Sequence, residues 1–339
     1  MPNPRLLAAA SIVVLVAACC AFTIASPGNA LVVYCAHDSI YSAQLLEKFE
    51  SQTGIEVAVR FDTEGTKSLG LVNLLLQEKE NPRCDVFWNN ELLGTLDLQE
   101  AGVLEPYKGP GHQRIPDRYR DPDGHWTGFG GRLRVGIFNT DRIPAKDRDL
   151  TELSSKSLNR MAIAKPLYGT TRTHITALWH QNGAERFKSS YRDLLEQGVL
   201  EVQGNSMVKN LVAAGTRDFG WTDTDDYYVA VDQKQPVAIA PVRLDGGETI
   251  CIPNTVAIIK GSTRTAEAKK LVEFLLSAET ELALSQSKSR QIPLGDCDET
   301  QLSEEVKQLR EWAESSCDLR EIAASRKACL HWLKSEYLQ

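Results

Sequence analysis

The chain has 339 residues, 42% hydrophobic and 24% charged, and can therefore bury a sizeable core. This length predicts about two domains. The formal net charge of −7, with no basic run interleaved with aromatic residues, argues against a nucleic-acid partner.

Residues 1–30 differ from the rest of the chain. Arg5 precedes an apolar run, Leu6–Ala25, which is typical of an export signal. The run is also close to the ~20 residues that an uncleaved membrane anchor needs. Val16–Cys19 resembles a bacterial lipobox, in which Cys19 would be lipidated. We therefore expect an exported protein, periplasmic or membrane-anchored through its N-terminus, with the folded part beginning near Leu31.

Cysteine usage leaves two interpretations open. An even number of cysteines in an exported protein permits disulfides, although sequence does not define their pairing. Buried free thiols are the alternative. The six cysteines that follow the N-terminal segment are Cys35, Cys84, Cys251, Cys297, Cys317 and Cys329, and none has a spacing that suggests zinc.

Three strand–loop–helix units are predicted in the first third of the chain. The strands are expected at Leu31–Tyr34, Ile55–Phe61 and Asp85–Trp88. Crossovers of this length require parallel strands, and ligands bind outside the carboxyl ends of such strands. Those ends carry polar loops: His37-Asp38, Thr63-Glu64-Gly65-Thr66 and Asn89-Asn90-Glu91.

A second α/β set is predicted further along. His112–Gly131 is rich in Gly, Pro, Asp and Arg and is expected to be a loop. Arg132–Asn139 is a strand that would leave the first domain. Later strands are expected at Met161–Ala164, Val237–Ala240 and Val256–Ile259. The tail, Gln301–Leu338, has the periodicity of two amphipathic helices, most simply explained by core packing.

The segment Tyr168–Thr173 is predicted as a loop before a helix around Ile175, Leu178 and Trp179, and it has the features of an anion site. Thr170 and Thr171 stand at a helix start, where free backbone N–H groups attract anions, and Arg172 is adjacent. Arg132 or Arg134 would be a second clamp on an acidic group. An ordinary capped helix is the alternative.

Trp221–Tyr228 concentrates three carboxylates and two phenols in eight residues. Such hard oxygen donors at the end of a strand suit a cation or a polar ligand. The alternative is structural: Asp and Thr cap the next helix, and Tyr227 and Tyr228 pack as an amphipathic edge.

Seven segments in order carry a family resemblance: Leu31–Tyr34 followed closely by a His, Phe49–Val57, Asp85–Trp88, Ala101–Tyr107, Gly131–Val135, Asn205–Ser206 and Ala268–Leu275. Together they resemble the type 1 extracellular solute-binding proteins of bacterial ABC transporters, particularly the ferric-iron branch. The resemblance implies an α/β, two-lobed periplasmic-binding-protein-like fold (type II) with a ligand cleft between the lobes. Lobe 1 would comprise residues 31–132 and 241–339, and lobe 2 residues 133–240.

The resemblance also implies a metal site. Iron-binding members hold the metal with an adjacent tyrosine pair, commonly with a His and a Glu. The nearest matches, with two nearby aspartates, are His37, Glu91, Tyr227, Tyr228, Asp223 and Asp225. A synergistic anion or organic cargo would contact Thr63, Thr66, Asn90, Arg132, Thr170, Thr171 and Arg172.

The chain departs from the iron pattern in its spacing. His37 stands one residue earlier and Glu91 one later than in that pattern. Counted from Asn205-Ser206, the position of the tyrosine pair falls at Asp225-Asp226.

We therefore expect the solute-binding component of an ABC importer, which captures ferric iron and delivers it to an inner-membrane permease. One alternative keeps the fold but binds a small anionic organic solute such as a phosphonate. Another alternative is a metal-dependent hydrolase that uses the aspartates. The ordered family motifs argue against this hydrolase. The chain has no G-x-S-x-G, H-E-x-x-H or Walker motif, so we do not expect an enzyme.

Overall fold

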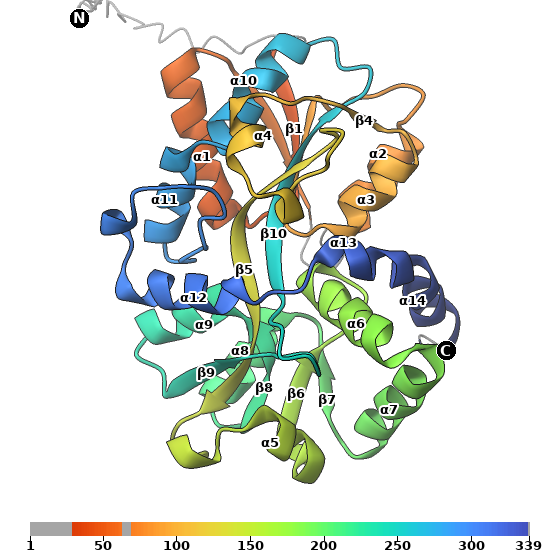
Figure 1. Ribbon diagram of the computed structural model, residues 1–339, viewed down its shortest axis with the longest axis vertical. Helices are drawn as coiled ribbons and strands as arrows, with labels where there is room; N and C mark the ends of the chain where they lie inside the picture. The colour runs from red at the N-terminus through yellow and green to blue at the C-terminus, as the bar shows by residue number, and fades with distance from the viewer. Residues whose placement is uncertain (1–28, 63–68, 338–339) are drawn as a thin grey trace, which may run out of the picture.

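The computed structural model describes residues 29–62 and 69–337. The chain forms two lobes, one above the other in Figure 1, each with a sheet flanked by helices. The main path of the strands runs β2-β1-β3-β10-β5-β8-β6-β7, with β4 beside β10 and β9 beside β5. The predicted two-lobed α/β fold is confirmed.

Lobe 1 contains most of the first 130 residues and the segment after β9. Its elements are β1 (Leu31–Cys35), α1 (Ser39–Thr53), β2 (Val57–Phe61), α2 (Leu69–Gln77), β3 (Val86–Asn89), α3 (Leu93–Glu100), β4 (Leu104–Glu105), α4 (Pro110–Arg114), the 3-10 turn Asp117–Tyr119, β10 (Cys251–Ile259), α10 (Thr265–Leu275), α11 (Ala278–Gln286), the 3-10 turn Glu299–Gln301 and α12 (Glu304–Glu314). β1 pairs in parallel with β2 and β3, as the strand–loop–helix pattern predicts.

Lobe 2 contains the 3-10 turn Ala145–Asp147, α5 (Leu150–Lys156), the 3-10 turn Leu158–Arg160, β6 (Met161–Ala164), α6 (Gly169–Asn182), α7 (Ala184–Glu196), β7 (Leu200–Val202), α8 (Asn205–Ala213), β8 (Phe219–Asp223), α9 (Thr224–Asp232) and β9 (Val237–Pro241). The chain ends in α13 (Leu319–Ile322), the 3-10 turn Ala323–Ser325, α14 (Arg326–Trp332) and the π-helical turn Leu333–Tyr337.

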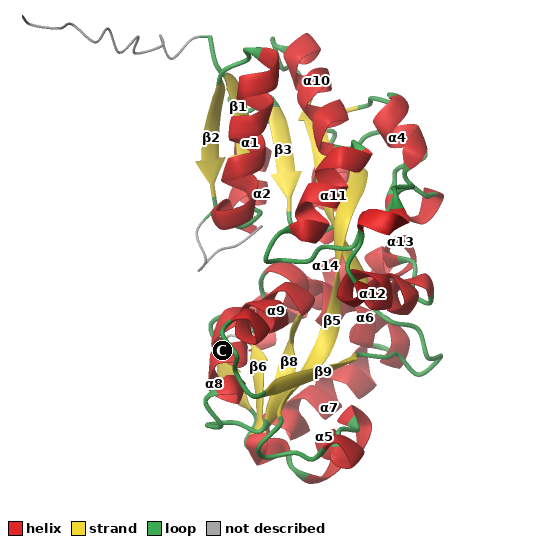
Figure 2. Ribbon diagram, turned by 90° about the vertical axis from the view of Figure 1, so that its left-hand side faces the viewer, coloured by secondary structure: helices red, strands yellow, loops and turns green. Residues whose placement is uncertain are grey.

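The long strand β5 (Thr127–Asn139) joins the lobes, and Figure 2 shows it running through both. Residues Thr127–Leu133 pair with β10, whereas Arg134–Phe138 pair with β8. Every residue of β5 is buried. The strand therefore places Arg132 and Arg134 at the junction between the lobes.

The structure differs from two predicted boundaries. Thr127–Gly131 is strand, not loop, because this glycine-rich segment is paired with β10. A side chain at Gly128 would meet the carbonyl oxygen of Tyr119 at 2.7 Å, so a glycine is needed for this close approach. The helix expected after Thr173 begins at Gly169, whose φ of +52° suits glycine.

The predicted range of lobe 1, which included residues 241–339, is wrong for the last helices of the chain, because α14 packs on lobe 2. Cys329, Trp332 and Leu333 are buried in the apolar cluster of lobe 2, among Trp179, Phe187 and other residues. Local hydrophobic periodicity predicts that a helix has a buried face, but it does not show which lobe buries that face.

The described cysteines are all free, so no disulfide joins them. Among the helices that the structure describes, none is long and apolar enough to cross a membrane. The proposed export signal, lipobox or anchor lies in residues 1–28, outside the described part of the chain.

Candidate functional site

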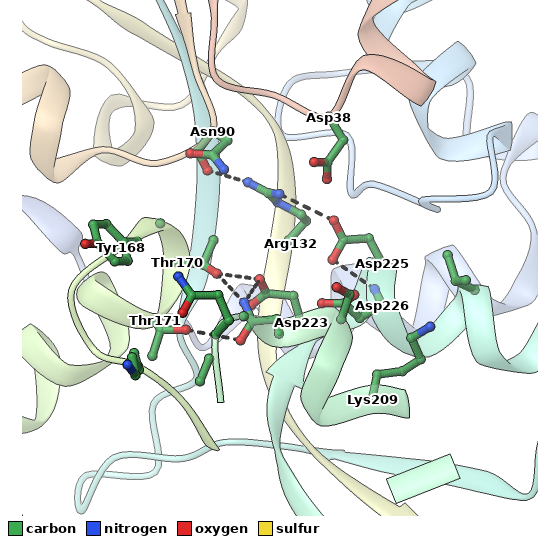
Figure 3. Close-up of a pocket in the computed structure, with 18 of the residues that line it drawn as sticks. Asp38, Asn90, Arg132, Tyr168, Thr170, Thr171, Lys209, Asp223, Asp225 and Asp226 are labelled. Carbon is green, nitrogen blue, oxygen red and sulfur yellow. Dashed lines mark hydrogen bonds and ion pairs between the residues drawn. The ribbon is translucent and has the colours of Figure 1, made fainter. Parts of the chain in front are cut away.

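A cavity of about 280 Å³ lies between the lobes, where the carboxyl ends of β1, β3, β6 and β8 meet. Lobe 1 contributes Asp38, Ile40 and Asn90, and β5 contributes Arg132. The residues from lobe 2 that line it are Ala164, Lys165, Tyr168, Gly169, Thr170, Thr171, Gln203, Gly204, Asn205, Ser206, Lys209, Asp223, Asp225, Asp226 and Val229. Figure 3 shows this arrangement.

Three aspartates form the most concentrated group on the cavity wall. Carboxylate oxygens of Asp223, Asp225 and Asp226 all lie within 4.8 Å of one another. Asp223 ends β8, and the other two stand in the first turn of α9. Asp38 faces the same space from lobe 1 (Figure 3). Such a set of hard oxygen donors can hold a hard cation.

Asp223 is held in place by a hydrogen-bond network. Its Oδ1 accepts from Arg134 Nη1 at 2.7 Å, and its Oδ2 accepts from Asn205 Nδ2 at 2.9 Å and from the hydroxyl of Thr170. Asn205 Oδ1 in turn accepts from the Thr171 hydroxyl at 3.1 Å. The network joins β5, β8 and the starts of α6 and α8, so the cavity wall is pre-organised.

Arg132 bridges the lobes inside the cavity. It donates to the backbone carbonyl of Asn90 in lobe 1 and, from Nη1, to Asp225 Oδ2 in lobe 2 at 3.4 Å. Burial opposes the charge of Arg132, but the carboxylates of Asp225 and Asp223 outweigh it and raise the pKa of the guanidinium. Arg132 therefore remains a cation within the cavity.

The same cavity offers groups that suit an anion. α6 and α8 both begin at its wall, and neither has a side-chain cap on its first-turn N–H groups. Lys165 and the buried Lys209 line it and form no ion pair with the described residues. The cavity therefore combines cation-binding carboxylates with a separate cationic, N–H-rich wall.

The predicted tyrosine pair lies outside this cavity. In α9 the residues Asp225, Asp226 and Val229 share the face that lines the cavity. A rotation of about 100° per residue turns Tyr227 and Tyr228 away. Tyr228 packs into the core cluster of lobe 1 beneath the guanidinium of Arg290, and burial raises the pKa of both phenols. Tyr227 and Tyr228 therefore do not face the cavity, and their raised pKa values disfavour the phenolate form that would bind a metal.

His37 is buried behind the cavity wall. Its ring stacks on Trp88 at 5.1 Å, and its Nε2 lies 2.6 Å from Gln291 Nε2. Because Gln291 Oε1 accepts from Asn254, the Gln291 amide nitrogen is the donor and His37 Nε2 the acceptor. The lone pair that would bind a metal is therefore used inside lobe 1.

Glu91 acts as a helix cap. Its carboxylate accepts from the backbone N–H of Leu93 at 2.5 Å and of Gly94 at 2.7 Å, at the start of α3. The side chain is 1% exposed and does not line the cavity. The carboxylate also accepts from the hydroxyl of Thr173 in lobe 2, at 3.3 Å.

Only some of the predicted anion-binding residues line the cavity. Asn90, Arg132, Thr170 and Thr171 line the cavity. Arg172 points instead toward lobe 1, where Nη2 contacts Asp97 Oδ2 at 3.1 Å. Thr63 and Thr66 lie outside the described residues.

Several cavity residues were not singled out from sequence. Asp38 was predicted only as part of a polar loop at the end of a strand, and Asp226 only as part of the acidic run, yet both line the cavity. The departure in spacing was the signal for Asp226, since counting from Asn205-Ser206 already led to Asp225-Asp226. Lys209 lies one helical turn after Asn205 on α8. The two residues therefore share one face of this helix, the face that lines the cavity.

Comparison with known proteins agrees with the fold. The family described as bacterial extracellular solute-binding protein matches residues 44–311. Iron uptake protein A1 of Synechocystis is 24% identical over 258 residues, 72% of this chain and 70% of that protein. The major ferric iron-binding protein of Neisseria meningitidis serogroup A is 26% identical over 287 residues, 78% of this chain and 81% of that protein.

Solved structures share the architecture. Iron-bound HitA from Pseudomonas aeruginosa superposes with a TM-score of 0.78 at 21% identity, over 89% of this chain and 98% of that one. The periplasmic binding protein AfuA from Actinobacillus pleuropneumoniae, with fructose-6-phosphate bound, gives 0.75 at 19% identity, over 91% and 99%. Two lobes with a polar cavity between them, together with the family match, identify the chain as a solute-binding protein. The chain belongs to the bacterial extracellular solute-binding protein family, a family of transport proteins.

Proposed function

We propose that this protein is the solute-binding component of an ABC importer, that it captures ferric iron in the interlobe cavity, and that it delivers the iron to a permease. The observation that carries the proposal is the approach of the Asp223, Asp225 and Asp226 carboxylates to within 4.8 Å on the cavity wall. Hard carboxylate oxygens are suitable ligands for a hard trivalent cation. The names of the relatives, iron uptake and ferric iron-binding proteins, support the same cargo.

The metal ligands in this proposal differ from the tyrosine-based set. Asp223, Asp225 and Asp226 supply oxygens from lobe 2, and Asp38 supplies one from lobe 1. Ligands from both lobes give the metal a higher affinity for the closed arrangement than for an open one, which is how a hinge-closing protein traps its cargo. We propose a transport role for this arrangement rather than a catalytic one.

A synergistic anion completes the proposed site. The cavity wall carries four aspartates but also Arg132, Lys165 and Lys209, so much of its negative charge is already balanced. Four aspartates and three cations leave one net negative charge on the wall, so a trivalent cation alone would give the site an excess of positive charge. A carboxylate or phosphate at the starts of α6 and α8 would balance that excess.

A small anionic organic solute, such as a phosphonate, is the second candidate. The buried Lys209 and the two uncapped helix starts support it, because both features favour an oxyanion even without a metal. The names of the two relatives favour iron instead.

Equilibrium dialysis of iron-stripped protein against ferric citrate tests the first proposal. Asp225→Asn and Asp226→Asn should each weaken iron retention by at least about tenfold, since each removes a charged ligand. Asp245→Asn, at an exposed aspartate away from the cavity, is the matched control. Retention unchanged by both cavity substitutions would refute the ligand set. Tight binding of 2-aminoethylphosphonate without iron would favour the second candidate.

The N-terminal segment belongs to the same proposal. We propose that residues 1–30 export the protein and hold it at the extracytoplasmic side of a membrane, near its permease, either as a lipid anchor on Cys19 or as an uncleaved apolar anchor. Mass spectrometry of the mature N-terminus distinguishes a lipidated cysteine from an intact leader.

A further inference from the structure

The last part of the chain extends beyond the family match, which stops at residue 311. We call the segment Leu319–Tyr337 the C-terminal strap. Figure 1 shows its helices α13 and α14 at the waist of the molecule, between α3 of lobe 1 and α6 of lobe 2. No part of the cargo site described above includes it.

The strap is anchored in lobe 2 by apolar burial. Cys329, Trp332 and Leu333 are at most 3% exposed, and the Trp332 ring lies 5.7 Å from the rings of both Trp179 and Phe187. The Tyr337 hydroxyl also donates to Glu201 Oε1 at 2.6 Å. Such burial makes α14 part of lobe 2, so the two should move together.

The strap contacts lobe 1 through apolar burial of α13 and through charges on α14. Leu319 and Ile322 are each 3% exposed and lie in the apolar cluster that contains Leu98 and Trp126 of lobe 1. Arg326 Nε donates to Asp97 Oδ1 at 2.8 Å, and both Arg326 and Lys327 pair with Glu100. Asp97 and Glu100 stand on α3. Glu100 is 52% and Lys327 64% exposed, so their ion pair is screened by solvent and is weaker than the apolar anchor, whereas Arg326 and Asp97 are only 12% and 18% exposed.

The strap connects to the cavity through α3 and α6. Asp97 also accepts from Arg172, which follows the cavity residue Thr171 in α6. One carboxylate therefore receives a guanidinium from the strap and another from the helix that begins at the cargo site. At its other end, α3 follows Asn90, which lines the cavity from lobe 1.

We propose that the C-terminal strap is an electrostatic latch that stabilises the closed arrangement of the lobes and slows cargo release. When the lobes separate, the ionic contacts of α14 with α3 break, whereas the apolar contacts of α13 with lobe 1 and of α14 with lobe 2 remain. The latch acts on the cavity of the proposed function, and in that respect the inference rests on it. Lobe closure itself can be measured without any cargo.

The test compares two double variants of the protein produced from its full-length sequence. Arg326→Gln with Lys327→Gln removes the latch cations. Arg310→Gln with Lys307→Gln removes one Arg and one Lys from α12, whose partners, Glu299 and Glu304, lie on the same side of the waist. Both variants change net charge equally, so a general charge effect would appear in both.

Small-angle X-ray scattering of cargo-free protein supplies the first measurement. At about 50 mM NaCl the latch variant should have a larger radius of gyration than the wild type and the control. At about 1 M NaCl, where screening is strong, all three should converge. Glu100→Gln, which changes the lobe 1 side of the latch, should reproduce the expansion without altering the strap. A latch variant and a Glu100→Gln variant that are both as compact as the wild type would overturn the proposal.

Release of ferric citrate supplies the second measurement. The latch variant should release iron about fivefold faster than the wild type at low salt, and the control should not. If no form of the protein binds ferric citrate, the proposed cargo fails while the scattering comparison still decides the latch. Expansion without any change in release would overturn the claim that the latch slows cargo release.

Discussion

Arg132 and Asp225 approach each other across the junction of the lobes, with Nη1 of the arginine 3.4 Å from Oδ2 of the aspartate. Both side chains are buried in the cavity wall, and Arg132 also holds the backbone carbonyl of Asn90. A cation beside the proposed metal ligands would repel a bare metal ion. It is better explained as a partner for an anion that enters with the metal.

Arg132→Gln should therefore weaken binding of ferric citrate by about 10–100-fold, the range that follows from losing a hydrogen bond to a charged group of about 1.5–3 kcal/mol. Isothermal titration with ferric citrate measures the change. Arg243→Gln is the control, because Arg243 is exposed and donates only to the Gly247 carbonyl among the described residues. Equal affinities for wild type and Arg132→Gln would show that the arginine serves the fold and not the cargo.

The position of the tyrosine pair leads to a spectroscopic prediction. Phenolate bound to ferric iron gives a visible charge-transfer colour, but Tyr227 and Tyr228 do not line the cavity. The protein saturated with iron should therefore lack this band, and Tyr227→Phe and Tyr228→Phe should bind iron as the wild type does. A visible band that disappears in either variant would contradict the carboxylate site.

Glu91 should make stability depend on pH in a defined direction. Burial raises the pKa of this carboxyl above 4.5. A group with a raised pKa binds its proton more tightly in the folded protein, so protonation stabilises the fold. As pH falls through the raised pKa toward 4.5, the free energy of unfolding of the wild type should rise relative to that of Glu91→Gln.

Urea unfolding at a series of pH values measures that difference. Glu314→Gln, at an exposed residue, should show no comparable trend. A difference between wild type and Glu91→Gln that stays constant with pH, or changes in the opposite direction, would remove Glu91 as a source of pH dependence.

The fold was readable from sequence because local patterns and chain order determine it. Buried strands followed by capped helices predicted the parallel pairing of β1 with β2 and β3, and hence the edge at which the cavity lies. The site was harder, since the residues that face a cavity depend on helix rotation. Asp225 and Tyr227 are two residues apart in α9, yet only the first lines the cavity.

Long-range contacts explain the other differences. His37 and Glu91 were placed on the correct edge of the sheet, but Gln291 and the start of α3 use their polar atoms. Gln291 is 254 positions from His37, and no local pattern connects the two. The contact of the strap with lobe 2 was not predicted for the same reason, because the residues against which it packs are distant along the chain.

Arg290 forms another ion pair between the lobes. It lies in the lobe 1 segment whose next residues contact His37 and Gly131, and it makes a two-pronged ion pair with Asp232 at the end of α9, at 2.7 and 3.1 Å. Its guanidinium also lies 4.7 Å from the centre of the Tyr228 ring. With a φ of +45°, its backbone is in a region that costs a non-glycine residue about 1–2 kcal/mol.

Two substitutions separate the contact from the backbone strain. Arg290→Gln and Arg290→Gly both remove the contact with Asp232, so both should release ferric citrate several-fold faster than the wild type. Arg290→Gly also relieves the strain and should be more stable than Arg290→Gln by about 1 kcal/mol in urea unfolding. Lys260→Gln, at an exposed residue that contacts neither Arg290 nor Asp232, should change neither quantity. Release rates that match the wild type in both Arg290 variants would mean that the ion pair does not hold the lobes together, and equal stabilities would mean that the positive φ carries no cost.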